Sequence, residues 1–174
     1  MQIPFITIAF ALVYPVCLLW ASWTDAMTMT IPNRLNMILA AAFVPVGCLV
    51  HLSLADWGWH IGLAAAGLVL GMICYALRFM GGGDAKLIAA AALWFDKTGF
   101  FALLIYTALA GGVLTLGLLA VRKAFWLYAH KAPPWLQQHL EPKGDIPYGI
   151  AICVGGLFAI VQGDIWPQLT AWAA

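Results

Sequence analysis

The sequence predicts an all-α integral membrane protein, a bundle of about six transmembrane helices in which the fourth helix is short. Two observations predict this class: 64% of the 174 residues are hydrophobic, and only 9% are charged. A soluble domain of this length needs more charged residues to cover its surface. We therefore expect the lipid bilayer to surround one transmembrane domain that covers residues 1–174.

Six apolar segments follow one another along the chain. They lie at about residues 4–24, 35–54, 60–79, 85–95, 99–121 and 146–166. Most approach the roughly 20 residues that a spanning helix needs. The first has no basic stretch before it, so we expect a retained helix and not a cleaved signal peptide. The fourth is too short, because at about 1.5 Å per residue it covers far less than the ~30 Å of a bilayer core.

Basic residues divide unevenly between the two sets of connections. One set holds Arg34, Arg78, Lys86, Arg122, Lys123, Lys131 and Lys143, and the other holds only Lys97. Loops rich in lysine and arginine stay in the cytoplasm. The bias therefore predicts a multi-pass protein of the cytoplasmic membrane with both termini outside. No basic run is long enough to suggest a nucleic-acid partner.

A pair of glycines in the third segment predicts close packing of helices. Gly67 and Gly71 share one face of the third segment, where small residues let helices approach closely. We expect packing within the chain, and a dimer face is the alternative.

The connection 122–144 mixes basic with aromatic residues. It is predicted to lie along the membrane surface, with a grip on substrate as the alternative.

Cysteine and histidine residues give no sign of a metal or nucleophilic site. The four cysteines are scattered through apolar segments and form no CxxC pair, so we expect no metal, no cofactor and no disulfide framework. The histidines have no obvious nucleophile partner, and we expect each of them at a surface or membrane interface. They are His51, His60, His130 and His139.

Two acidic residues lie where a charge is costly. Asp25 and Asp84 belong to short, nearly uncharged stretches at the expected cytoplasmic ends of the first and fourth segments. If Asp96 and Lys97 mark the outer interface, counting back to Asp84 covers about 18 Å, which places Asp84 below the cytoplasmic surface. Ionisable residues at such depth are candidates for a functional site. The alternative is that Asp84 only caps the helix that follows it.

Glycine and proline residues accompany both acids. The triplet Gly81 to Gly83 precedes Asp84 and would let an extended peptide lie against the backbone, although a flexible turn is the alternative. The run Ile31-Pro32-Asn33 follows Asp25, and its proline could open the second helix. Two carboxylates at one depth can share a proton, so that one activates water while the other polarises a carbonyl group.

Three ordered motifs resemble those of the type IV prepilin peptidase family, the GxGD intramembrane aspartyl peptidases. The run Met80 to Leu87, MGGGDAKL, resembles the GxGD signature. Asp25 with Ile31-Pro32-Asn33 resembles the family's first aspartate segment, and Ile146 to Ala151, IPYGIA, resembles the start of its last helix. The resemblance implies a single transmembrane peptidase domain over residues 1–174 in a bacterial inner membrane.

The resemblance also implies an activity and a set of site residues. It implies an aspartic endopeptidase that removes the basic leader from pilin precursors at the cytoplasmic face, with Asp25 and Asp84 as the catalytic pair. Positions that bind substrate or shape the site are then Gly81, Gly82, Gly83, Lys86, Ile31, Pro32, Asn33, Pro147, Tyr148 and Gly149. The implied partners are a prepilin and the bilayer.

The chain departs from the larger members of this family. Those members carry a cytoplasmic insertion with paired CxxC motifs and also methylate the new N-terminus. This chain has neither the insertion nor the pairs, so methyltransferase activity is not expected. The short form resembles the TadV and CpaA peptidases of tight-adherence (Flp-type) pilus systems.

Two other functions remain as alternatives. A proton-linked transporter subunit also uses paired membrane acids, but here both acids cluster at one face, and no acid lies in the middle of the second, third or fifth segment. A non-catalytic membrane protein of pilus assembly would use the glycine-rich helices as its interface. It predicts that Asp84→Asn leaves function intact.

Overall fold

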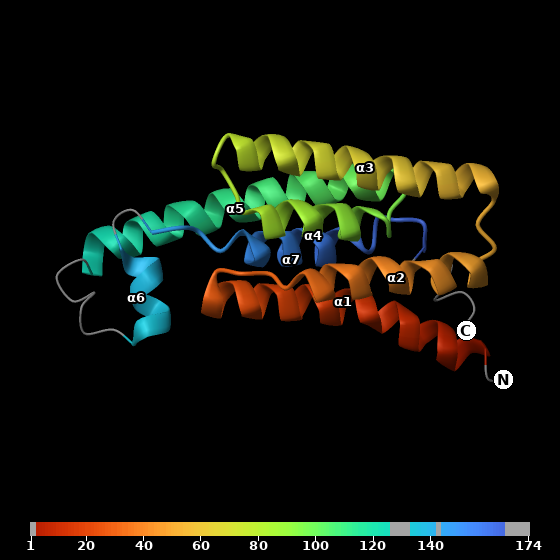
Figure 1. The fold of residues 1–174 in the computed structure, drawn as a ribbon, viewed down its shortest axis with the longest axis horizontal. Helices are drawn as coiled ribbons and strands as arrows, with labels where there is room; N and C mark the ends of the chain where they lie inside the picture. The colour runs from red at the N-terminus through yellow and green to blue at the C-terminus, as the bar shows by residue number, and fades with distance from the viewer. Residues whose placement is uncertain (1–2, 126–132, 142–143, 166–174) are drawn as a thin grey trace.

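The computed structural model describes residues 3–125, 133–141 and 144–165. These residues form seven α-helices and no strand, which confirms the all-α class. The helices are α1 (Ile3–Thr28), α2 (Asn33–Leu49), α3 (Leu54–Ala76), α4 (Gly82–Ala92), α5 (Lys97–Phe125), α6 (Pro134–Leu140) and α7 (Tyr148–Ala159). Figure 1 shows α1 to α5 and α7 running along the long axis, while α6 lies across one end.

Helix length decides how much of the membrane prediction the structure supports. Among the described residues, two helices are long and apolar enough to cross a membrane, Leu54–Ala76 and the stretch Lys97–Ala124 of α5. The helices α2 and α7 are apolar but shorter. The six crossings therefore stay a prediction. The short fourth helix is confirmed, because α4 has 11 residues.

Local hydrogen bonds explain where two helix boundaries differ from the predicted segments. α3 begins at Leu54, earlier than predicted, because Ser53 and Asp56 form a reciprocal capping box. α7 ends at Ala159, earlier than predicted, because the N–H groups of Gln162 and Gly163 turn back to its carbonyl oxygen.

The long connection after α5 contains a helix that the sequence analysis did not predict. α6 is preceded by Pro133 and begins at Pro134, and proline is well tolerated at a helix start because no N–H partner is needed there. Residues 126–132 and 142–143 of this connection, with Lys131, Lys143 and His130, lie outside the described residues.

Small residues let α7 and α4 pack closely against their neighbours. A Cβ atom at Gly155 would overlap Thr107 of α5, and one at Gly156 would lie 2.6 Å from Leu18 of α1. Gly71 of α3 approaches the α4 backbone in the same way, at 2.7 Å. Gly71 thus serves packing within the chain, as predicted.

The described basic residues lie at the ends of the bundle in the pattern that the sequence predicts. We call the end that carries α6 the α6 end; there α1, α3 and α5 finish and α2, α4 and α7 begin (Figure 1). Arg34, Arg78, Lys86, Arg122 and Lys123 belong to helix ends on this side, whereas Lys97 opens α5 on the other side.

Candidate active site

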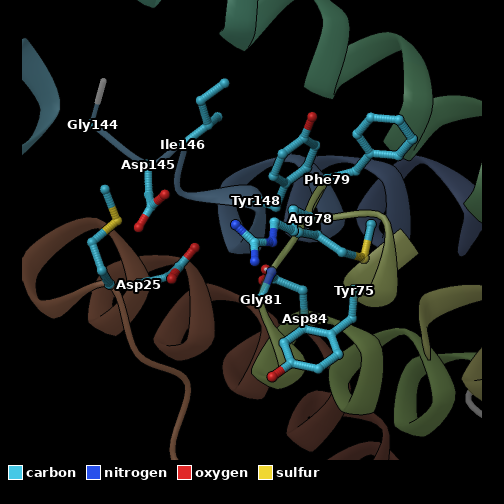
Figure 2. Close-up of a pocket in the computed structure, with 12 residues that line it drawn as sticks. Asp25, Tyr75, Arg78, Phe79, Gly81, Asp84, Gly144, Asp145, Ile146 and Tyr148 are labelled. Carbon is cyan, nitrogen blue, oxygen red and sulfur yellow. The ribbon is translucent and has the colours of Figure 1, made fainter. Parts of the chain in front are cut away.

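A recess of about 500 Å³ opens at the α6 end of the bundle (Figure 2). Its walls come from four parts of the chain that are distant in sequence: the end of α1, the end of α3, the start of α4 and the segment that leads into α7. Both acids singled out by the sequence, Asp25 and Asp84, line it. We call this recess the acidic pocket.

Asp25 lies in the last turn of α1 and is held by the start of α7. Its side chain is 5% exposed, and its Oδ2 accepts a hydrogen bond of 2.7 Å from the backbone N–H of Gly149. First-turn N–H groups have no partner within their own helix. Gly149 must lack a side chain here, because a Cβ atom would lie 2.9 Å from both Cβ and Oδ2 of Asp25. Gly149 therefore positions the carboxylate.

Asp84 lies in the first turn of α4 and bonds back to the residue that precedes the helix. Its Oδ2 accepts a 2.8 Å hydrogen bond from the N–H of Gly81. Asp84 is therefore not the N-cap residue considered from the sequence; Gly81 is, and Asp84 bonds back to it from inside the helix. This hydrogen bond uses only one of the two carboxylate oxygens. Oδ1 of Asp84 is buried and has no hydrogen-bond partner among the described residues. Such an atom needs a reason to exist in a native fold, and a water or a substrate group in the pocket would supply one.

The two carboxylates interact across the acidic pocket. Asp25 and Asp84 line the same pocket and their side chains point toward one another (Figure 2), although 58 residues lie between them in the chain. Each uses Oδ2 for a backbone N–H group. The arrangement leaves one oxygen of each carboxylate for chemistry in the space between them.

The remaining motif residues around Ile31 and Lys86 support the site without lining it. A Cβ atom on Gly83 would lie 3.2 Å from Cβ of Ile31, so the glycine run packs against the segment after α1. Nζ of Lys86 donates to Oδ1 of Asn33 at 2.9 Å. The two sequence motifs are thus brought together, but Ile31, Pro32, Asn33 and Lys86 are not among the residues that line the acidic pocket.

Residues before α7 complete the wall opposite α4. Tyr148, from the third motif, lines the pocket together with Ile146, Asp145 and Gly144. Asp145 is exposed and adds a third carboxylate to the pocket. Sequence analysis placed it only in a connecting segment, although its position directly before the IPYGIA motif was a usable signal.

Two residues of the pocket have a backbone conformation that is unusual for their type. Arg78 has φ of 61° and Met29 has φ of 52°. Arg78 follows the C-cap of α3, where the N–H of Phe79 bonds to the carbonyl oxygen of Cys74 and the N–H of Arg78 to that of Tyr75. Glycine usually occupies this position of such a motif. The strained residue directs its side chain into the pocket, toward the side where both acids lie (Figure 2).

A buried arginine fixes the segment that carries Asp145. Arg122, near the end of α5, is 8% exposed and donates to the carbonyl oxygens of His139 at 2.7 Å, Gly144 at 2.9 Å and Asp145 at 3.0 Å. Sequence analysis treated Arg122 only as a marker of topology. Its three bonds instead hold α6 and the pocket wall together.

His139 extends this network to the first aspartate. One ring nitrogen, Nε2, donates to the carbonyl oxygen of Ala26 at 2.7 Å, which places the ring beside the residue that follows Asp25. The prediction of a surface histidine is therefore wrong for His139, which is buried. His60 is buried as well, and its ring bonds to the carbonyl oxygen of Leu93 at the other end of the bundle, so its predicted place near the outer membrane interface stays a prediction.

No metal site is placed among the described residues, where no group of three or more histidine, cysteine or acidic side chains could hold an ion. The site brings two carboxylates to one pocket, at one end of a helical bundle in which two of the described helices are long and apolar enough to cross a membrane.

Comparison with known sequences assigns this bundle to a family. The sequence model of the type IV leader peptidase family matches residues 12–116, a stretch that contains both Asp25 and Asp84, and the chain belongs to this family. Two curated relatives are the prepilin leader peptidase/N-methyltransferase of Aeromonas salmonicida and that of its strain A449. Each is 25% identical over 166 residues, which cover 87% of this chain and 47% of the relative.

The chain spans about half the length of these curated relatives. No solved structure gives a significant match.

Proposed function

We propose that this chain is an intramembrane aspartic endopeptidase of the bacterial cytoplasmic membrane, which removes the basic leader from type IV prepilins at the cytoplasmic face. One observation carries the proposal: Asp25 and Asp84 line a single pocket, and each is held by a backbone N–H group. Membership of the leader peptidase family favours this function over a proton-linked transporter or a non-catalytic assembly protein.

The proposed chemistry needs one proton shared between the two carboxylates. The ionised carboxylate takes a proton from a water molecule, and the resulting hydroxide attacks the scissile carbonyl carbon. The protonated carboxylate donates to the carbonyl oxygen as negative charge develops there. When the tetrahedral intermediate collapses, the C–N bond breaks and the leaving nitrogen takes the proton that the first carboxylate accepted from water. The proton on the former carbonyl oxygen returns to the second carboxylate. Oδ1 of Asp84 lacks a hydrogen-bond partner among the described residues. We assign this oxygen as the atom through which Asp84 takes part in these proton transfers.

The charge of the pocket suits the substrate that we propose. Asp145 is exposed at the pocket, where its carboxylate can pair with a lysine or arginine of the leader. We propose that Asp145 binds the leader while Asp25 and Asp84 carry out hydrolysis. Asp145→Asn should then raise KM for a basic leader peptide several-fold and leave kcat nearly unchanged, as measured by initial rates on synthetic peptides. A fall in kcat alone would place Asp145 in the chemistry instead.

We further propose that the chain is the short, Flp-type form of the peptidase. It lacks CxxC pairs, so methylation of the new N-terminus is not part of the proposal. Six membrane crossings with both termini outside would place the α6 end, with its basic residues, in the cytoplasm. The leader and the acidic pocket would then lie on the same side of the membrane.

Reconstitution with a candidate prepilin tests the proposed function. The purified full chain in liposomes should release the leader peptide, as detected by mass spectrometry. Asp25→Asn and Asp84→Asn should each reduce release to a trace, while Asp56→Asn, which changes an exposed acid at the other end of the bundle, should not. Robust cleavage by either pocket variant would reject the two-aspartate mechanism. A folded wild-type chain that cleaves no prepilin would reject the substrate.

A further inference from the structure

A second recess, of about 650 Å³, lies on the other side of α4 from the acidic pocket. It is formed by α2, α3 and α4, and the short α4 packs against each of the other two helices (Figure 1). Asp84 and Lys86 are two positions apart on α4, which rotates their side chains by about 200°. Because Lys86 lines this recess and Asp84 does not, the recess is separate from the site proposed above. We call it the α2–α3 groove.

Polar groups are confined to one end of the α2–α3 groove. Lys86 lies at this end, and its ammonium group donates to Oδ1 of Asn33 at 2.9 Å. An ammonium group has three N–H donors, so two remain for another acceptor. The exposed end of the groove therefore offers a positive charge with free donors.

Asn36 lies one helical turn deeper in the same groove. Its side chain is 6% exposed, and neither Oδ1 nor Nδ2 has a hydrogen-bond partner among the described residues. Leaving a buried polar group unpaired costs about 1–3 kcal/mol. Asn36 lines the groove, but both of its amide atoms are shielded. A bound molecule with a polar group at this depth would satisfy them once the side chain turns toward the groove.

Beyond Asn36 the walls of the groove are apolar. They include Ala40 of α2, Ala64, Ala65 and Leu68 of α3, and Leu93 of α4. Small side chains on two facing helices keep the groove open. Its volume is within the range of about 300–1,000 Å³ that is typical of ligand pockets.

We infer that the α2–α3 groove binds an anionic glycerophospholipid. The order of chemistry along the groove, a cation, then an amide, then apolar walls, matches the order of phosphate, ester and acyl chain in such a lipid. The phosphate would pair with Lys86, the ester carbonyl would accept from Nδ2 of Asn36, and one acyl chain would cover the apolar walls.

Other occupants satisfy the groove less well. A hydrophobic helix, from a second copy or from a substrate, has its backbone polar groups bonded internally, so it offers Asn36 no partner unless a polar side chain happens to meet it. A zwitterionic lipid brings its own cation next to Lys86. Every anionic glycerophospholipid carries a phosphate for Lys86 and an ester carbonyl for Asn36.

Native mass spectrometry of the full chain in mild detergent tests this inference. Phosphatidylglycerol should remain bound at least tenfold more than phosphatidylcholine. Asn36→Leu, which keeps the branching of the side chain and removes the amide, and Lys86→Gln should each reduce phosphatidylglycerol retention about tenfold, the equivalent of one hydrogen bond. Arg34→Gln is the matched control, because Arg34 is an exposed cation at the same end of α2 that lines a different recess.

Several results would overturn the inference. Equal retention of phosphatidylcholine would show that binding does not depend on the charge of the headgroup. Full retention of phosphatidylglycerol by both groove variants would show that the lipid binds elsewhere. Tight binding of glycerol 1-phosphate would indicate an anion site without a lipid. A dimer that Asn36→Leu disrupts would assign the groove to a second copy. The Asp84→Asn variant should bind lipid like the wild type, so this test stands apart from that of the peptidase.

Discussion

Each end of the bundle places an acid near a buried histidine, but only at the α6 end are the acids themselves buried. At the α6 end, Asp25 and Asp84 face a cavity of about 500 Å³ and are held by single backbone N–H groups. At the opposite end, His60 bonds to the carbonyl oxygen of Leu93 and lies 3.9 Å from Asp164.

Packing around the two groups explains the difference. The ring of His60 stacks near Phe43, with centroids 5.1 Å apart, and Phe43 in turn meets Trp57 and Trp94. Interlocked aromatic rings therefore surround the polar group at that end and fill the space beside it. At the α6 end, glycines and connecting segments leave the carboxylates a cavity. Asp25 and Asp84 differ from the buried His60 in the cavity that lies in front of them, so burial of a polar side chain does not by itself mark a reactive site.

Adding one methyl group beside Asp25 should have the largest effect on this comparison. Gly149→Ala places Cβ 2.9 Å from the Asp25 carboxylate, so the side chain must move, and a shift of about 1 Å can cost roughly 10²-fold in rate. The measurement is the initial rate of leader release in liposomes. Gly112→Ala is the control, because a Cβ there meets nothing within 4 Å. Equal rates for both variants would mean that Gly149 does not position Asp25.

Removing the buried guanidinium should have the next largest effect. Arg122→Gln deletes bonds to three carbonyl oxygens and should lower the free energy of unfolding by about 1–3 kcal/mol. Leader release should fall about tenfold at a temperature where the variant is folded, because the pocket wall loosens. Thermal unfolding and initial rates measure the two effects. The neighbouring exposed Lys123 provides the control, Lys123→Gln, which should change neither quantity.

Replacing the strained arginine should separate stability from activity. Arg78→Gly relieves a φ of 61° and should raise stability by up to about 1 kcal/mol, while leader release falls several-fold because the pocket loses its cation. His51 has a φ of 56° after α2, at the opposite end, so His51→Gly is the matched variant for activity. A several-fold loss in both variants would remove the distinction between the two ends.

The smallest effect is expected from the acid paired with His60. Asp164→Asn keeps the size of the side chain and changes no residue of the acidic pocket, so leader release should stay within about twofold of the wild type. A loss comparable to that of Asp84→Asn, in a variant that still unfolds cooperatively, would mean that the two ends are coupled in catalysis.

The features that follow from local composition were predicted from the sequence. Asp25 and Asp84 stood out because acids are rare in apolar chains. The glycines before Asp84 were predicted to admit an extended peptide; the structure packs Gly83 against Ile31, and the peptide contact stays a prediction. The short α4 followed from counting residues against membrane thickness. These features depend on local composition, so one sequence was enough.

Other features depend on contacts that form only in the fold. Arg122 is buried because a turn 22 and 23 residues further on offers it carbonyl oxygens, and His139 reaches back 113 residues to Ala26. No local pattern distinguishes such residues from surface cations and surface histidines. The positive φ of Arg78 was equally hidden, because glycine is the usual signal for that conformation.

A double-mutant cycle on leader release tests most directly whether Asp25 and Asp84 act as one unit. Residual rates are measured for Asp25→Asn, Asp84→Asn and the double variant, all folded in liposomes. Groups that work together lose nearly everything with the first substitution, so the double variant should release leader no more slowly than either single variant. Losses that multiply, with the double variant far slower than both, would contradict a shared proton and a common site.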